Sequence, residues 1–314
     1  MYVQAAHSIS PQSNSIETGQ LSPDLIIQEP DYKKVIPARM LRRMSKILKM
    51  GVFSGLRTLE LAGIEEPDAI ITATGLGSLA DTVKFLDQIE EQTDSMLSPT
   101  PFIQSTHNTV GGQIALALKS NAYNMTFVQQ HLSFECALLD ASLLLKESPD
   151  QNILLGGVDE RHEILNHAYN ELSNATGKAL LHPVTEGASF FMFTGVPGEH
   201  SKAHVLHTSM VKLDSDSAKN LKSIICDHEV SFMLKGSMLT TDNEFYEALQ
   251  LPMRSLDYKQ YCGEYFTCSG FALYLATQML NNTVVINDYS GGSIAILNKF
   301  LDNVGLTILS KVEL

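Results

Sequence analysis

The chain has 314 residues, 44% of them hydrophobic, and a formal charge of −13 from 22 basic and 35 acidic side chains. This length allows about two domains or one large double unit with a buried core, and the acidic balance argues against a nucleic-acid-binding surface. The four cysteines include no CxxC pair, so neither a zinc site nor a disulfide framework is expected. No long apolar run and no leader pattern is found, which predicts a cytoplasmic protein without membrane insertion.

The first half of the sequence alternates predicted helices and strands. A polar surface loop is expected over residues 10–33, and a basic amphipathic helix over 39–49. Its basic face is either solvated or a docking patch for an acidic partner. Apolar runs and helical spacing then predict a helix at 51–63 that ends at Gly63, a strand with a glycine turn at 68–78, a helix at 80–92, a strand at 124–129, a helix at 133–146 and a buried strand at 152–160.

The second half repeats this mixture. Strands are predicted at 187–195 and 203–213, and a helix-rich stretch contains 218–228 and 243–249. A helix at 268–280 is followed by a terminal hairpin of residues 284–289 and 293–300. Strands alternating with helices in two halves indicate an α/β fold with largely buried sheets.

Several segments resemble the β-ketoacyl synthases, the condensing enzymes of fatty acid and polyketide assembly. They follow the order of that family's motifs: the helices at 37–64, "STHNTVGGQIALAL" (105–118), "ILLGGVDE" (153–160), "TEGASFFMF" (185–193) and "NDYSGGSIAIL" (287–297). The resemblance implies a thiolase-like fold, in which two similar βα halves are stacked in five layers (α-β-α-β-α), usually as a dimer. We expect the halves to be residues 1–165 and 166–314, with trimmed loops around the acyl tunnel.

The catalytic positions of this family are substituted. Condensation needs a cysteine thiolate at a helix N-terminus and two histidines that assist decarboxylation and stabilise an oxyanion. The resemblance places His131 at the former cysteine position, and Lys235 and Glu264 at the two former histidine positions. Because Lys235 and Glu264 carry opposite charges, they are expected to form a pair across the old active site. The alternative is that both side chains reach solvent, where a pair is worth little.

The loss of all three groups resembles the chain length factors, which are non-condensing partners of ketosynthases. The small members linked to aryl polyene and flexirubin-like pigments are the nearest in kind. The implied partners are an active ketosynthase, in a heterodimer rather than a homodimer, and an acyl carrier protein; no cofactor or metal is expected. Two alternatives stay open: an acyltransferase or thioesterase that uses His131 with Ser133 or Cys262, and a catalytically silent homodimeric acyl-binding protein.

Other residues are candidates for substrate contacts or for structural roles. Ser133 and Phe134 follow the former nucleophile position, His107 and Asn108 lie in the segment that approaches the family's dimer interface and tunnel, and Gly291 and Gly292 resemble its Gly-Gly turn.

No chemical role is expected for three further features of the sequence. Cys136 lies inside a helix and is expected to be a packed, inert thiol. "TGLGS" (74–78) lacks the further residues of a nucleotide or phosphate motif and predicts a tight turn. "DERHE" (159–163) is expected to be a solvated loop after its strand.

Overall fold

Ten strands of the described residues form one continuous mixed sheet, in which the second half repeats the strand order of the first. The computed structural model describes residues 1–11, 25–91, 98–214, 216–286 and 288–313. The order is β3-β2-β4-β5-β1 in the first half and β8-β7-β9-β10-β6 in the second, so strands in equivalent positions correspond. The strands are β1 (Tyr2–Ile9), β2 (Ala69–Ala73), β3 (Tyr123–Phe127), β4 (Ile153–Asp159), β5 (Gly187–Thr194), β6 (Ala203–Lys212), β7 (Val230–Gly236), β8 (Arg254–Asp257), β9 (Ser293–Phe300) and β10 (Asn303–Ser310).

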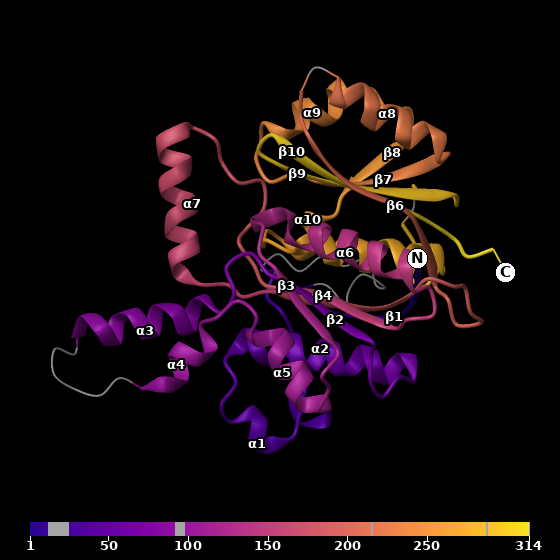
Figure 1. The fold of residues 1–314 in the computed structure, drawn as a ribbon. Coiled ribbons are helices and arrows are strands. Elements are labelled where there is room, and N and C mark those ends of the chain that lie inside the picture. The colour runs from indigo at the N-terminus through magenta and orange to yellow at the C-terminus, as the bar shows by residue number, and fades with distance from the viewer. Residues whose placement is uncertain (12–24, 92–97, 215, 287, 314) are drawn as a thin grey trace.

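The two groups of strands face each other across a central layer of helices (Figure 1). The helices α6 (Ser133–Glu147) and α11 (Cys268–Leu280) fill this layer and contact strands of both halves. On the outer faces, α2 (Lys46–Ala62) and α5 (Thr109–Leu118) cover the first group. The second group is covered by α8 (Ser217–Asp227) and α9 (Asp242–Ala248). This layering confirms the predicted thiolase-like α/β fold in five layers.

The central layer holds the largest apolar core. Helix α11 is apolar on nearly all sides, as expected of a helix enclosed between two sheets, and Phe271, Leu273 and Leu275 are all fully buried. Phe134 and Leu138 of α6 lie in the same cluster. The core therefore holds the N-termini of α6 and α11 in the same layer, and both termini carry candidate site residues.

The predicted boundary between the halves at residue 165 falls within α7 (Glu163–Thr176). Strand β5 follows α7, yet it pairs with β4 and β1 of the first half. The two groups of strands join only afterwards, where β1 pairs antiparallel with β6 through Tyr2 and His204. We therefore propose that the boundary lies between β5 and β6.

The predicted basic helix and the predicted terminal hairpin differ in the structure. The predicted basic helix is divided: α1 (Ala38–Leu41) covers its first part, and its last residues belong to α2. Helix α2 continues without interruption through Met50 and Gly51, which are both buried. The terminal hairpin consists of β9 and β10, whereas the described residues of 284–289 form no strand. Strand β1 was not predicted. Residues 12–24 of the predicted loop at 10–33, and Asn287 in the predicted hairpin, lie outside the described residues.

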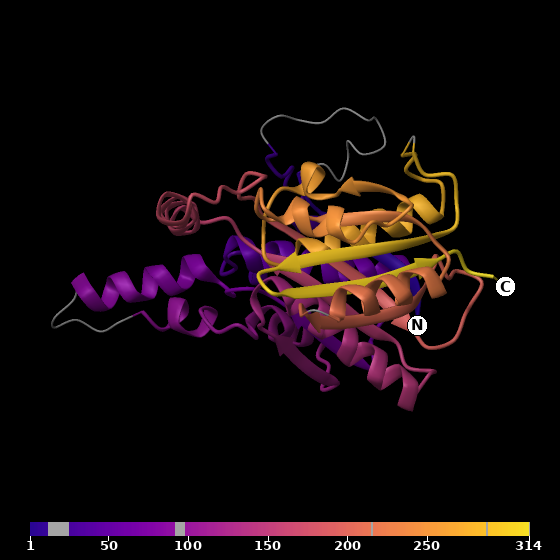
Figure 2. The same cartoon turned by 90° about the horizontal axis from the view of Figure 1, so that it is seen from above.

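Helices α3 (Leu79–Glu91) and α4 (Pro99–Gln104) project together from the first half, and α7 stands apart from the sheets (Figures 1 and 2). Two 3-10 turns, η2 (Tyr32–Lys34) and η3 (Gln130–Leu132), and the one-turn helix α10 (Lys259–Cys262) complete the described helices. None of these helices combines the length and apolar character needed to cross a membrane.

Candidate active site

The position that the resemblance assigns to the nucleophile lies in the tight connection between β3 and α6. His131 is the middle residue of η3, and it is only 2% exposed. Ser133, the first residue of α6, holds this turn closed: its Oγ donates to the Gln130 carbonyl at 2.7 Å and accepts from the Gln129 N–H at 2.7 Å. The buried Ser133 hydroxyl is therefore engaged with the backbone, which disfavours its use as a nucleophile.

Glu264, which the resemblance assigns to a histidine position of the family, lies just after α10. Gly263 ends this one-turn helix with φ of +72°, and a Cβ there would lie 2.2 Å from Thr185. This glycine turn brings Glu264 back toward α10, and two backbone hydrogen bonds fix it: Glu264 N–H donates to the Pro183 carbonyl, and Thr185 N–H donates to the Glu264 carbonyl, both at 2.9 Å. The position of the carboxylate is thus set by the backbone on both sides.

Glu264 contacts two other buried groups. Lys259 Nζ donates to Glu264 Oε2 at 2.8 Å, and both side chains are 1% exposed. His131 Nε2 lies 3.2 Å from Glu264 Oε1, but the direction of this contact does not meet hydrogen-bond geometry. Among the described residues, neither His131 ring nitrogen has a hydrogen-bond partner. The carboxylate therefore joins the lysine and the histidine in one buried cluster.

Aromatic rings and an amide enclose His131. Its ring stacks on Phe300 with a centroid distance of 4.3 Å and lies 4.6 Å from the tilted ring of Phe266. Asn298 Nδ2 donates to the His131 carbonyl at 2.7 Å and to Glu135 Oε1 at 2.8 Å. Asn298 and Phe300 belong to the end of β9, so the second half of the chain covers His131.

Burial and the neighbouring charges determine the ionisation of this cluster. Burial lowers the pKa of His131, and Glu264 opposes this only in part, so the imidazole is neutral near pH 7. Burial alone would raise the pKa of Glu264, but Lys259 and His131 outweigh it and the pKa is lowered. Burial alone would likewise lower the pKa of Lys259, but neighbouring groups, among them Glu264, raise it. The site therefore contains an ionised Lys259–Glu264 pair beside a neutral histidine.

The predicted Lys235–Glu264 pair is corrected by this geometry, since Lys259 is the lysine that contacts Glu264. Side chains alternate between the two faces of a strand. In β7, Leu234 faces the central layer, whereas Lys235 faces the outer layer, where its Nζ lies 5.7 Å from the ring centroid of Tyr246 in α9. Lys235 therefore points away from the central layer that contains Glu264.

Gly291 and Gly292 are not brought to His131. They precede β9 with φ of 110° and 94°, and Ser231 Oγ donates to the Gly291 carbonyl at 2.5 Å. Asn298, which contacts His131, lies six residues further along this extended strand, or about 20 Å away. The part of the second half that reaches His131 is instead the β9–β10 hairpin.

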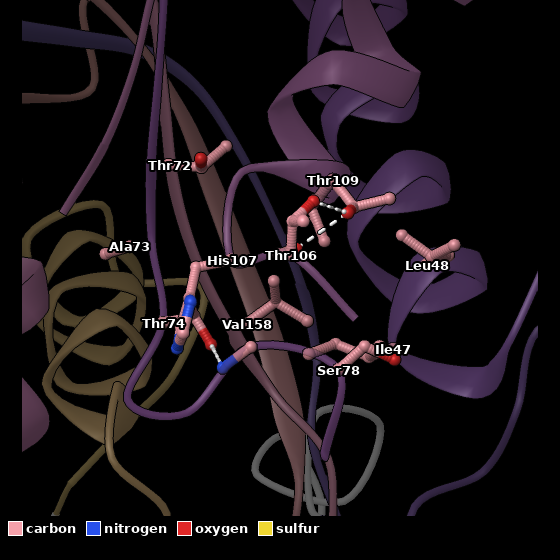
Figure 3. Close-up of a pocket in the computed structure, with 12 residues that line it drawn as sticks. Ile47, Leu48, Thr72, Ala73, Thr74, Ser78, Thr106, His107, Thr109 and Val158 are labelled. Carbon is pink, nitrogen blue, oxygen red and sulfur yellow. Dashed lines mark hydrogen bonds between the residues drawn. The ribbon is translucent and has the colours of Figure 1, made fainter. Parts of the chain in front are cut away.

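His107 and Asn108 lie at the surface, between α4 and α5. Figure 3 shows His107 beside Thr74, in the turn that follows β2, and Thr106 bonded to Thr109 at the start of α5. The predicted tight turn is present, because Gly77 has φ of +67° and its N–H donates to Thr74 Oγ1. The cavity between these residues has a volume of about 10 Å³, which is room for about one water molecule and not for an acyl chain.

Asp159 is a buried residue that the sequence did not single out. It ends β4, and its carboxylate accepts hydrogen bonds from Thr74, Gly75 and Thr267 at 2.7–2.9 Å. Burial raises its pKa to about 6, although these hydrogen bonds oppose the shift. The predicted solvated loop at 159–163 is therefore wrong for its first two residues, since Glu160 is also buried. Asp159 connects loops of the two halves and has a structural role.

The remaining cysteines offer no prepared thiolate. Cys262 and Cys268 are fully buried, and burial raises the pKa of both thiols, that of Cys268 to about 12. Cys136 is partly buried against Met210, with a raised pKa. Since the thiolate is the nucleophile, none of the three has the low pKa of a reactive cysteine.

Alkylation of the native protein at pH 7.5 should therefore modify the exposed Cys226 first and Cys136 more slowly. Cys262 and Cys268 should react only after unfolding, because both are enclosed. Peptide mass spectrometry after iodoacetamide treatment distinguishes the four thiols. An acyl adduct on Cys262 or Ser133 after incubation with an acyl thioester would contradict the structural roles given to these residues.

Within the described ranges, His, Cys, Asp and Glu side chains form no group that could hold a metal ion. The imidazole of His131 lies between the rings of Phe266 and Phe300, and the carboxylate of Glu264 is paired with Lys259.

The chain belongs to the β-ketoacyl synthase family, since the model of the β-ketoacyl synthase N-terminal domain matches residues 18–229. Three solved structures share the fold, each aligned over 99% of both chains. They are a β-ketoacyl synthase from Burkholderia phymatum STM815 (TM-score 0.78, 12% identity), the ishigamide ketosynthase/chain length factor (0.77, 15%) and a type II PKS acyl-carrier protein in complex with its ketosynthase, AntDE:AntF (0.76, 15%). No protein of curated function matches the sequence.

Proposed function

We propose that this chain is a non-condensing, chain-length-factor-like subunit, which pairs with an active ketosynthase and helps to shape the acyl tunnel of a type II fatty acid or polyketide-type system. The observation that carries the proposal is the buried cluster of His131, Glu264 and Lys259. An imidazole enclosed by Phe266 and Phe300 cannot accept an acyl group as a cysteine thiolate does. A glutamate ionised against Lys259 is a poor replacement for a histidine that donates to an oxyanion.

The proposed partners are an active ketosynthase and an acyl carrier protein. Two of the structures with the same fold are described as a ketosynthase/chain length factor and as an acyl-carrier protein in complex with its ketosynthase. We further propose that the chain belongs to the branch of the family linked to polyene pigments and acts in the cytoplasm. The engaged Ser133 hydroxyl and the buried Cys262 thiol disfavour an acyltransferase or thioesterase.

The free edge of β3 is the surface we propose for the ketosynthase. The sheet ends at β3 on one side and at β8 on the other. Strand β8 is short, and its Arg254 is paired with Asp288, which makes it a poor template for another strand. Strand β3 instead presents Tyr123 and Met125, each 41% exposed. A partner with the same fold offers the same edge, so two β3 strands can continue one sheet across a two-fold axis.

The purified chain alone should neither decarboxylate malonyl-carrier protein nor condense it, whereas its complex with a ketosynthase should do both. Assays of the chain alone, the ketosynthase alone and the co-purified pair separate these contributions. A neighbouring gene that encodes a ketosynthase would supply the first partner to co-express. Turnover by the chain alone at the rate of a ketosynthase would contradict the proposal. A stable homodimer that does not bind the ketosynthase would favour a catalytically silent homodimeric acyl-binding protein.

A further inference from the structure

Glu135 carries a carboxyl group enclosed in the central layer, where the two halves of the chain meet. It lies in the first turn of α6, one of the two helices that fill this layer in Figure 1, and it is only 3% exposed. Strand β10 passes beside it at Gly305, where a Cβ would lie 2.5 Å from Glu135 Cγ. The glycine leaves the space that the side chain fills, so elements of both halves enclose this carboxyl group.

The hydrogen bonds of this carboxyl group leave one of its oxygens without a donor. Asn298 Nδ2 of β9 donates to Glu135 Oε1 at 2.8 Å, whereas the buried Oε2 has no hydrogen-bond partner among the described residues. Ser269 Oγ of α11 lies beside the carboxyl group and also lacks a partner in hydrogen-bonding geometry. A proton on Oε2 supplies a donor for the serine hydroxyl, so the neutral acid satisfies both atoms.

The groups around Glu135 do not neutralise a negative charge on it. Lys259 is engaged with Glu264 at 2.8 Å, and no ion pair of the described residues includes Glu135. The titratable groups Tyr258 and Cys136, which also interact with it, bring no positive charge. One buried lysine cannot balance two carboxylates, so an ionised Glu135 would be a costly buried charge. Burial raises the pKa of Glu135 to about 7, although its hydrogen bonds and Lys259 oppose the shift.

We propose that Glu135 folds as the neutral acid and fastens the β9–β10 hairpin to α6 in a proton-dependent way. The link runs through Asn298, whose amide donates both to Glu135 and, at 2.7 Å, to the His131 carbonyl. The folded chain keeps the proton of Glu135, and the unfolded chain releases it. The folded state, and with it the enclosure of His131, is therefore favoured at mildly acidic pH. This inference is independent of the proposed function, since it concerns the fold of the chain alone.

The contribution of Glu135 to stability has a defined direction with pH. The carboxyl group of the unfolded chain titrates near its usual pKa of 4.5, and that of the folded chain at about 7. The contribution is therefore fully present below pH 4.5 and is lost as the pH rises through 7. The difference between the two pKa values corresponds to a change of about a hundredfold in the equilibrium constant for unfolding over this range.

The test compares Glu135→Gln with the wild type by urea denaturation between about pH 5 and pH 8. Glutamine keeps the shape of the side chain, an acceptor for Asn298 and a donor for Ser269, but it cannot ionise. The variant should unfold at about the same urea concentration as the wild type at the acidic end and at a clearly higher concentration at the alkaline end. Glu60→Gln is the matched control, because Glu60 is an exposed glutamate of a helix, paired with Arg57. Its urea midpoint should follow that of the wild type across the whole pH range.

Infrared spectroscopy of the folded proteins gives a second measurement. Near pH 6, the difference between wild type and Glu135→Gln should contain the carbonyl band of a protonated carboxyl group, which should disappear with a midpoint near pH 7. Asp159 and Glu160, whose pKa values are also raised, cancel in this difference. A carboxylate band in its place, or a difference in urea midpoint that does not change with pH, would overturn the proposal. So would a variant that is strongly destabilised or unfolded at every pH, since a neutral amide should replace a neutral acid.

Discussion

Glu264→Gln is expected to lower the free energy of unfolding by about 3–5 kcal/mol, because it leaves the Lys259 ammonium buried without its counter-charge. The side chain of Lys259 is 1% exposed, so water cannot replace the lost carboxylate. Urea denaturation measures the change through the midpoint and the slope. Glu186→Gln is the matched control, since Glu186 pairs with the 40% exposed Lys46, and loss of a partly exposed pair should cost about 1 kcal/mol or less.

A second variant distinguishes the contribution of the Lys259–Glu264 ion pair to stability from the contribution of side-chain packing in the site. Lys259→Met/Glu264→Leu removes both charges and should recover much of the lost stability, because apolar residues of similar volume often replace a buried ion pair without penalty. The single variants Lys259→Met and Glu264→Leu complete the comparison. If the loss of stability in the double variant equalled the sum of the losses in these two, Lys259 and Glu264 would not be coupled. That result would contradict the pair as the main stabilising contact of the site.

The effect of Glu264→Gln should also depend on pH. The pKa of Glu264 is lowered from its usual value of 4.5, so its contribution is present above pH 4.5 and is lost as the pH falls through the lower, folded-state pKa. The pKa of Lys259 is raised above 10.5, so its contribution persists up to that value. The difference between wild type and variant should have its full value at about pH 5 to 6 and shrink toward pH 3. A constant difference down to pH 3 would show that Glu264 is not ionised in the folded protein.

The layers of the fold could be predicted because their signals are local. Buried strands such as β4 and the all-apolar α11 are recognisable from a few consecutive residues. Strand β1, "YVQAAHSI", mixes polar and apolar residues and was missed. The apolar, β-branched "VVI" at 284–286 suggested a strand that pairs with β9. Strand β9 instead forms its hairpin with β10, and residues 284–286 lie outside the sheet.

The candidate site was predictable only in part because its contacts are long-range. The resemblance predicted His131 and Glu264 for one site, and the two side chains lie 3.2 Å apart, but the predicted partner of Glu264 was Lys235 whereas the structure has Lys259. The choice of lysine depends on the φ of Gly263 and on the strand face of Lys235, neither of which a motif shows. Asn298 could have been recognised as a candidate, because it is an amide in an otherwise apolar stretch. Its contact with His131 could not, since the two residues are 167 positions apart.

Under the proposed function, the buried cluster and the edge of β3 both fit a subunit that acts through a complex. A subunit that no longer condenses is retained for what it contributes to a complex, and its former active site can then be filled by a stable pair. The cluster joins the segments that precede α6 and α11 through contacts among His131, Glu264 and Asn298. Strand β3 leads directly into η3, so a partner bound along β3 lies against the element that carries His131.

Tyr123→Lys/Met125→Lys should therefore abolish the complex with the ketosynthase while the chain stays folded. Residues 123 and 125 alternate onto the same face of β3, and both are 41% exposed in the isolated chain. Burying two new charges in a strand interface costs several kcal/mol, which corresponds to about a hundredfold or greater loss of affinity. Size-exclusion chromatography of the mixed proteins and a titration of the complex measure this loss.

The control for this experiment is Leu61→Lys, which places a charge at an exposed apolar residue of α2, away from β3. It should leave the complex intact, because only the strand edge is proposed to pair. The thermal unfolding of the free β3 variant should match that of the wild type, since its altered side chains already contact water. If the β3 variant binds the ketosynthase as tightly as the wild type does, the partner uses another surface. If Leu61→Lys weakens the complex equally, that surface includes α2.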